Sequence, residues 1–198
     1  MPTSTPVARP PPSGATLGRV QSLLAGSVGV LCLAVLAGCG RDVAEPGSDV
    51  PSQIAVTSPA FAEGAAIPTR FSCRAADVSP PLRWTGVPAG AAQLALVVDD
   101  PDAPRGTFVH WVVFALPPDA TGLEEGQLPG GARQARNSAG DAAYAGPCPP
   151  SGTHHYRFTV YALRAPLDLP AGAGLDEALA GIDERVLAKG RLVGTFSA

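Results

Sequence analysis

Short apolar runs, separated by connections rich in glycine and proline, dominate the second half of the chain. Residues 93–98 (QLALVV) form a continuous apolar run between turn-forming residues, which is typical of a buried strand. Residues 108–116 (FVHWVVFAL) are apolar on both alternating faces, whereas residues 156–163 (YRFTVYAL) alternate more cleanly. Residues 54–57 and 191–196 predict two further strands.

Two histidines fall inside this strand pattern. The alternation over residues 108–116 predicts that His110 shares a face with Val112 and Phe114. The alternation that continues back from residue 156 predicts that His154 shares a face with Tyr156. Each histidine is therefore expected beside apolar side chains on one side of a strand.

One segment near the C-terminus has helical spacing. Acidic residues suit its first turn, and Lys189 followed by Gly190 suits its end. The apolar positions follow a 4-3-4 rhythm at Leu175, Leu179, Ile182 and Val186. The long connection 117–152 contains no convincing periodic element and is expected to be functional or otherwise constrained.

Composition supports a mainly β, loop-rich fold with a single domain. The chain has 198 residues, of which 16% are charged, 6% are aromatic, 23 are glycine and 22 are proline. This length allows one ordinary domain with its own core. The formal net charge of −3 argues against a nucleic-acid-binding protein, which would normally carry a basic face.

The N-terminus is expected to lie outside this domain. Residues 1–22 contain basic but no acidic residues, and residues 23–38 (LLAGSVGVLCLAVLAG) are uncharged. Sixteen residues are short for a membrane span, and a basic segment before a brief apolar core is typical of a secretory signal. The sequence Leu-Ala-Gly-Cys at 36–39 resembles the bacterial lipobox, in which the cysteine is acylated and becomes the first mature residue. An uncleaved anchor helix is the alternative.

These features predict three parts: a lipoprotein signal peptide at 1–38, a flexible tether at 39–53 and a domain at 54–198. The protein is then extracytoplasmic and held at a membrane through the lipid on Cys39. If lipid occupies Cys39, an even pair of cysteines, Cys73 and Cys148, remains in the mature chain. The pair forms either a disulfide or two separate buried thiols, and the sequence leaves both open.

Chemistry-bearing residues gather in two segments. DDPDAP at 99–104 follows a predicted strand and precedes His110, while GPCPP at 146–150 precedes His154. The prolines stiffen both turns and hold the carboxylates of Asp100 and Asp102 in place. A strand histidine or an Asp-Pro turn taken singly is more often structural. Together the two segments predict one recess lined by imidazole and carboxylate groups.

The segments DDPDAPRGTFVHWVVFALP and YAGPCPPSGTHHYRFTVYAL resemble the phosphatidylethanolamine-binding protein family, and more narrowly its bacterial Raf kinase inhibitor-like branch. The resemblance covers residues 54–198. It implies a β-sandwich-like core, a C-terminal helix and a small anion-binding cavity. His155 stands where many relatives have arginine. The cavity residues that the resemblance implies are Asp100, Asp102, His110 and His154, with Pro104, Gly146 and Tyr156 shaping the wall.

Relatives in this family bind phosphate-like ligands or phospholipid headgroups, and no catalytic activity or cofactor belongs to the family as a whole. We therefore expect a tethered binding protein for a small anion or headgroup. The carboxylates should mainly orient the histidines, with at least one histidine protonated when the anion binds, so affinity should rise from pH 8 to pH 6.

Two alternatives remain. The first is an inhibitor of a secreted or envelope serine protease that presents loop 122–137. The second is a metal-dependent hydrolase that uses Asp100, Asp102, His110 and His154, although the chain has no HExxH motif.

Overall fold

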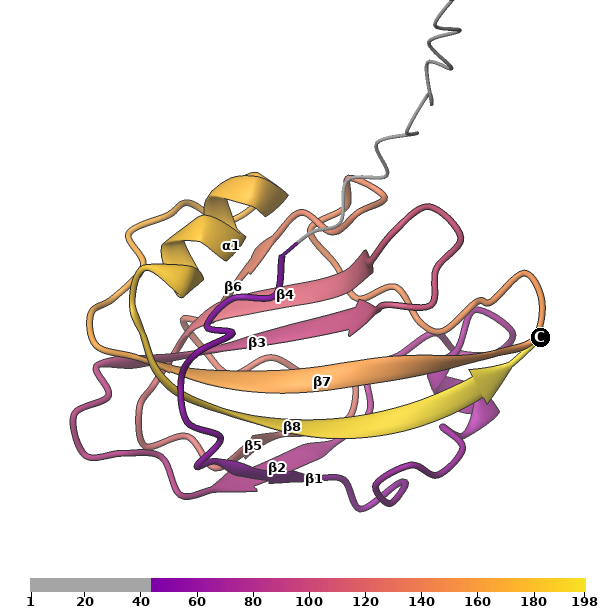
Figure 1. The fold of residues 1–198 in the computed structure, drawn as a ribbon, viewed down its shortest axis with the longest axis horizontal. Coiled ribbons are helices and arrows are strands. Elements are labelled where there is room, and N and C mark those ends of the chain that lie inside the picture. The colour runs from indigo at the N-terminus through magenta and orange to yellow at the C-terminus, as the bar shows by residue number, and fades with distance from the viewer. Residues whose placement is uncertain (1–43) are drawn as a thin grey trace, which may run out of the picture. The chain divides into compact units, whose positions relative to one another are not determined.

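The computed structural model describes residues 44–198, which form two antiparallel sheets and a helix (Figure 1). The predicted signal peptide and Cys39 lie outside the described residues. One sheet has the strand order β6-β4-β3-β7-β8 and the other β1-β2-β5. The elements are β1 (Ala55–Thr57), a 3₁₀ turn (Thr69–Phe71), β2 (Leu82–Thr85), β3 (Gln93–Asp100), β4 (Phe108–Leu116), β5 (Gly122–Leu123), β6 (Arg133–Ala135), β7 (Thr153–Leu163), α1 (Leu175–Asp183) and β8 (Val186–Ser197). The fold is mainly β, as predicted.

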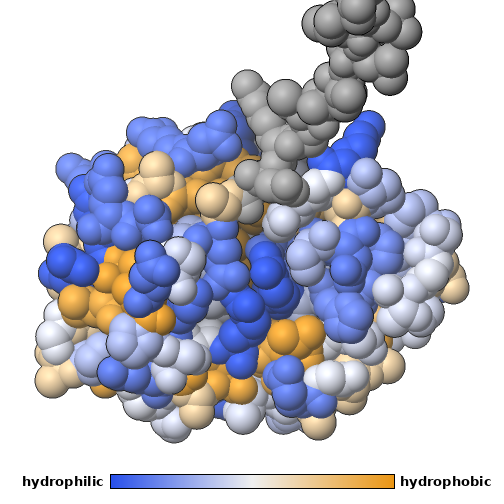
Figure 2. Space-filling view, viewed as in Figure 1, coloured by the Kyte–Doolittle hydropathy of each residue, from blue (hydrophilic) through white to orange (hydrophobic). Residues whose placement is uncertain are grey.

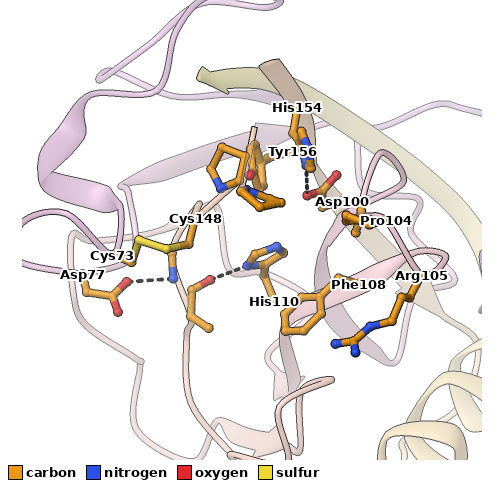
Figure 3. Close-up of a pocket in the computed structure, with 15 residues that line it drawn as sticks. Cys73, Asp77, Asp100, Pro104, Arg105, Phe108, His110, Cys148, His154 and Tyr156 are labelled. Atoms are coloured by element: carbon orange, nitrogen blue, oxygen red, sulfur yellow. Dashed lines mark hydrogen bonds and ion pairs between the residues drawn. A yellow bond between two sulfur atoms is a disulfide. The ribbon is translucent and has the colours of Figure 1, made fainter. Parts of the chain in front are cut away.

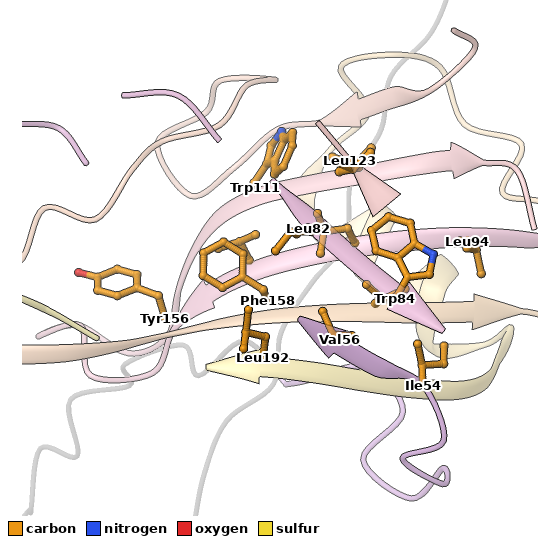
Figure 4. Close-up of a cluster of buried hydrophobic side chains, with 14 of the residues drawn as sticks. Ile54, Val56, Leu82, Trp84, Leu94, Trp111, Leu123, Tyr156, Phe158 and Leu192 are labelled. Carbon is orange, nitrogen blue, oxygen red and sulfur yellow. The ribbon is translucent and has the colours of Figure 1, made fainter. Parts of the chain in front are cut away.

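The main core lies between the two sheets. Tyr156 and Phe158 of β7 belong to this core together with Trp84 of β2, and all three side chains are buried (Figure 4). A second apolar cluster lies on the other face of the five-stranded sheet, where Ile182 of α1 packs with Tyr161 of β7. Strand β3 is buried along its whole length because it is covered on both faces, which explains its unbroken apolar run.

Strand β4 departs from simple alternation at His110. Val98 pairs with Trp111 and Asp99 pairs with Val109, so His110 is the extra residue of a β-bulge. Beyond the bulge, Val112 packs in the helix-side cluster and Trp111 in the core between the sheets. The predicted grouping of His110 with Val112 on one regular face is therefore wrong. The alternation of apolar and polar residues along a sequence gives no sign that one residue of a strand is left unpaired in a bulge.

The predicted helix is shorter than its apolar rhythm suggests. It ends at Asp183, and β8 then pairs with β7 along nearly its whole length. Lys189 and Gly190 therefore lie within β8 and do not end the helix. Gly190 is required there because a side chain would collide with the backbone of Ile54. The strict alternation of buried and half-buried residues in β8 explains why this segment extends as a strand.

The predicted flexible tether at 39–53 is wrong for residues 45–53. The Glu45 carboxylate accepts a hydrogen bond from Lys189 Nζ at 2.7 Å, and Gly47 N–H donates to Asp183 Oδ1 at 2.7 Å. The backbone N–H of Gln53 donates to the carbonyl of Lys189, and the N–H of Lys189 donates to the carbonyl of Pro51. Charge pairing and strand-like backbone bonding thus hold a segment whose composition alone is typical of a linker. Residues 39–43 lie outside the described part of the chain.

Candidate functional site

A cavity of about 610 Å³ opens where the ends of three strands meet three loops (Figure 3). The last residue of β3 and the first residues of β4 and β7 contribute to it, together with loops 73–77, 103–105 and 145–150. The two segments that the sequence singled out are thereby brought together. Six of the seven predicted ligand-binding residues line the cavity: Asp100, Pro104, His110, Gly146, His154 and Tyr156.

His154 is oriented by Asp100. The two side chains are 9% and 5% exposed, and Nδ1 of His154 lies 2.7 Å from Oδ2 of Asp100. The other carboxylate oxygen of Asp100 accepts the backbone N–H of Asp102 at 2.8 Å. With Nδ1 donating to the carboxylate, His154 has its Nε2 available for a ligand, as a donor once the ring is protonated.

His110 is oriented by a backbone carbonyl. Its Nδ1 lies 2.7 Å from the carbonyl oxygen of Ala145, which must accept the Nδ1 proton. Burial lowers the pKa of His110 below its usual value, although that carbonyl and the charge of Asp100 act in the opposite direction. A neutral His110 in this tautomer has a lone pair on Nε2. The site therefore contains a hydrogen-bond acceptor beside the Asp100–His154 pair.

The hydroxyl group of Tyr156 lacks a good hydrogen-bond partner. The side chain is fully buried, and its hydroxyl makes no hydrogen bond of good geometry among the described residues, although the Asp100 carboxylate and the Cys148 backbone lie close enough to affect its pKa. The ring meets His110 edge-on, with 5.2 Å between the ring centroids. Burial raises the pKa of Tyr156 well above its usual value, so the hydroxyl keeps its proton and can donate it. A buried hydroxyl without a partner is costly, which points to a partner that the protein itself does not supply.

Asp102 does not line the cavity, although it was predicted to do so. Its carboxylate turns outward. Oδ2 accepts hydrogen bonds from the backbone N–H of His155 at 2.8 Å and from Nδ1 of the His155 ring at 2.7 Å. The Asp102 side chain is 42% exposed, and the hydrogen bond from His155 lowers its pKa. Successive turns of the DPDAP segment place Asp100 inward and Asp102 outward, a difference that composition and spacing do not reveal.

A disulfide forms one wall of the cavity. Cys73 and Cys148 are bonded, with 5.6 Å between their Cα atoms, which decides between the two alternatives left open by the sequence. Nearby, Asp77 accepts the backbone N–H of Gly146 at 2.7 Å. Gly146 has no room for a side chain, because a Cβ would collide with Asp77 and with the carbonyl of Phe71. These contacts join two loops that are far apart in the sequence.

Sequence reasoning missed several lining residues. Asp77 lies in loop 73–77, which has no periodic signal, and only tertiary contact brings it to the cavity. Arg105 and Phe108 also line the cavity (Figure 3). They could have been found, because both lie within the DDPDAPRGTF segment that was already singled out.

Within residues 44–198, no group of three or more His, Cys, Asp or Glu side chains is arranged to hold a metal ion. No helix in this part of the chain is both long and apolar enough to cross a membrane.

The profile of the family described as phosphatidylethanolamine-binding protein matches residues 57–197. The chain belongs to this family. Among solved structures, a phosphatidylethanolamine-binding protein (PEBP) homolog from Chlamydia trachomatis has a TM-score of 0.70 and 37% sequence identity, covering 74% of this chain and 99% of that one. Escherichia coli YbcL, described as a member of the mammalian PEBP family, has the same TM-score and coverage with 30% identity.

The similarity to one sequence relative extends beyond the folded domain. A Mycobacterium tuberculosis protein named as a lipoprotein, LppC, is 44% identical over 201 residues, covering 93% of this chain and 98% of that protein. A UPF0098 protein of Methanothermobacter thermautotrophicus is 47% identical over 142 residues, covering 69% of this chain and 94% of that protein.

Proposed function

We propose that this PEBP-family chain is a membrane-tethered, extracytoplasmic binding protein for a small phosphate-like anion or phospholipid headgroup. The observation that carries the proposal is the unpartnered hydroxyl of buried Tyr156, beside two histidines whose Nδ1 atoms are already engaged. A phosphoryl group offers several acceptor oxygens and satisfies such a set of groups. Arg105, which also lines the cavity, adds a positive charge.

The carboxylates in the cavity restrict the charge of the ligand. Asp77 and Asp100 both line the cavity and disfavour a dianion. The hydrogen bond from Nδ1 to Asp100 holds the His154 ring in place, so its Nε2 is the ring nitrogen available to the anion. A monoanion that can also donate a proton to neutral His110 is the best match. Phosphate and phosphate monoesters become monoanions near pH 6.

Membrane attachment is supported by the sequence of the N-terminus and by the lipoprotein name of the LppC relative, whose similarity covers 93% of this chain. We place the lipid on Cys39. The Cys73–Cys148 disulfide is consistent with an oxidising, extracytoplasmic compartment.

We propose binding and not catalysis. The cavity lining contains no serine, threonine or lysine, and both of its cysteines are consumed by the disulfide. Asp100 is held by hydrogen bonds on both carboxylate oxygens. The remaining groups are the Asp77 carboxylate, which accepts the Gly146 N–H, the Tyr156 hydroxyl and the histidine ring nitrogens. None of them is paired as an activated nucleophile with its base, which leaves orientation of a ligand as the better-supported role.

Calorimetry with inorganic phosphate and with phosphoethanolamine tests the proposal. Affinity should increase about tenfold from pH 8 to pH 6, because the ligand becomes a monoanion over that range. His154→Ala should abolish binding. His155→Ala is the matched control, since its side chain is exposed and lies outside the cavity.

Vesicles with and without phosphatidylethanolamine distinguish a lipid headgroup from a free phosphate compound as the ligand. No binding of either soluble compound and no preference between vesicles would overturn the proposal. Equal affinity at both pH values would contradict the charge argument.

A further inference from the structure

The segment that leads into the domain is clamped by a buried charge cluster. The Glu45 carboxylate is 21% exposed and contacts Lys189, Arg157 and Arg191, which lie on the outer face of β7 and β8. Partial burial acts to raise the pKa of Glu45, but hydrogen bonds from Arg191 and Lys189 outweigh it and lower the pKa to about 2. Glu45 is therefore charged, and together with Asp99, which also bonds Arg157, it offsets the positive charge of these partly buried side chains.

The clamp continues beyond Glu45. Gly47 donates to Asp183 at the end of α1, and its φ of +62° suits glycine at this turn. Ser52 pairs with Lys189 of β8. Figure 1 shows this segment crossing the five-stranded sheet from the side of α1 towards β1. Figure 2 shows a hydrophilic band over β7 and β8 on the same face, between hydrophobic patches.

We infer that this clamp turns a long tether into a short one, so that the face of the five-stranded sheet bearing Glu45 and α1 is held against the lipid bilayer. The inference rests on the proposed lipid anchor at Cys39. Only five residues, 40–44, separate that cysteine from Glu45. Six residue steps span about 20 Å when fully extended.

Chain length determines which face can reach the membrane. A domain of this size is about 30–40 Å across, estimated from the radius of gyration of a compact chain. A span of about 20 Å is too short to let the opposite face, formed by β1, β2 and β5, rest on the bilayer. If residues 39–53 were free, fifteen steps would span about 50 Å and any face could touch the membrane. The contacts of Glu45 and Gly47 remove that freedom.

Energy transfer to labelled lipid headgroups tests this orientation in the full lipidated chain, reconstituted in phosphatidylcholine vesicles. Each of two variants carries one dye-labelled cysteine, Asp49→Cys beside the clamp or Thr85→Cys on β2, and both sites are exposed. The native mature cysteines are acylated or disulfide-bonded, so the introduced thiol takes the dye. We expect transfer from residue 49 to exceed that from residue 85 at least twofold.

Three further variants distinguish an effect of the clamp from an effect on general stability. Ten Gly-Ser residues inserted after residue 41 disturb no described contact and should make transfer from the two sites equal. Glu45→Gln should reduce the difference between the sites, whereas Glu63→Gln, which removes an exposed carboxylate bonded to Val193 N–H, should not.

Mass spectrometry of the same samples distinguishes the possible failures. An unmodified Cys39 would overturn the membrane tether itself, and this inference with it. An acylated Cys39 with equal transfer from residues 49 and 85, or with transfer unchanged by the insertion, would overturn only the orientation.

Discussion

The Nδ1 atom of His154 lies 2.7 Å from Oδ2 of Asp100, and these two buried side chains come from neighbouring strands, β7 and β3. The pair joins the two proline-stiffened segments of the sequence into one site. It also leaves His154 Nε2 as the atom available to a ligand. Several measurable consequences depend on this pair and on the groups around it.

Asp100→Asn should weaken phosphate binding at pH 6 about tenfold, equivalent to about 1.4 kcal/mol. The neutral amide preserves the size of the side chain but is a weaker hydrogen-bond acceptor for His154 Nδ1 than the carboxylate, so the ring is held less firmly. Asp102→Asn is the matched control, because its carboxylate bonds only His155 outside the cavity. Calorimetry at pH 6 measures both, and an equal loss in the two variants would contradict the assigned role of Asp100.

Tyr156→Phe should weaken phosphate binding without lowering the stability of the fold. Removing a buried hydroxyl without a partner should leave the free energy of unfolding unchanged or raise it by up to about 1 kcal/mol, while phosphate affinity falls about tenfold. Tyr144→Phe is the contrast, because the Tyr144 hydroxyl donates to the carbonyl of Phe71 at 2.9 Å and its loss should cost about 1 kcal/mol. Urea denaturation and calorimetry measure the two effects. A destabilised Tyr156→Phe that still binds would refute the assignment.

Glu45→Gln should destabilise the domain in a pH-dependent way. The pKa of Glu45 is lowered from 4.5 to about 2 in the folded protein, so its carboxylate stabilises the fold above pH 4.5 and loses that effect as pH falls towards 2. At pH 7 the loss should be about 1–2 kcal/mol, allowing for solvent screening. Denaturation of both proteins between pH 7 and pH 2 should show the gap closing. A gap that is constant with pH would exclude the charge as its cause.

Removing the Cys73–Cys148 disulfide should destabilise the domain by about 4 kcal/mol. The bond joins residues 75 positions apart, and constraining a loop of that length in the unfolded chain accounts for the estimate. The double variant Cys73→Ser/Cys148→Ser avoids a free thiol. Its midpoint of urea denaturation should match that of the reduced native protein and should not respond to reductant. A difference below about 1 kcal/mol would show that the hydrogen bonds around the wall suffice.

Much of the β architecture could be read from local sequence. The run at residues 93–98 became β3, and the alternation at 156–163 became the inner and outer faces of β7. Strand β2 was not predicted, because its four residues follow two prolines and are too few to show a clear period. The strands β5 and β6, which lie within the connection 117–152, were not predicted either, because they are also too short to show a period.

The site could be predicted as a set of segments but not as an arrangement. The two proline-rich segments were recognisable because each combines turn residues with a nearby histidine. The position of Asp77, however, depends on its hydrogen bond to Gly146, 69 residues away. Contacts of that separation have no periodic or compositional signal in a single sequence.

The sequence by itself determined that residues 93–98, 108–116 and 156–163 form strands, where the stiff turns lie and that Cys73 and Cys148 could pair. These properties depend on residues close together along the chain. Only the tertiary structure decided that Asp100 faces the cavity while Asp102 faces solvent, that a bulge disrupts alternation at His110, and that Glu45 is clamped. The reason is physical: the direction of a side chain at a turn or a bulge, and the partner of a charge, are determined by distant residues that folding brings into contact.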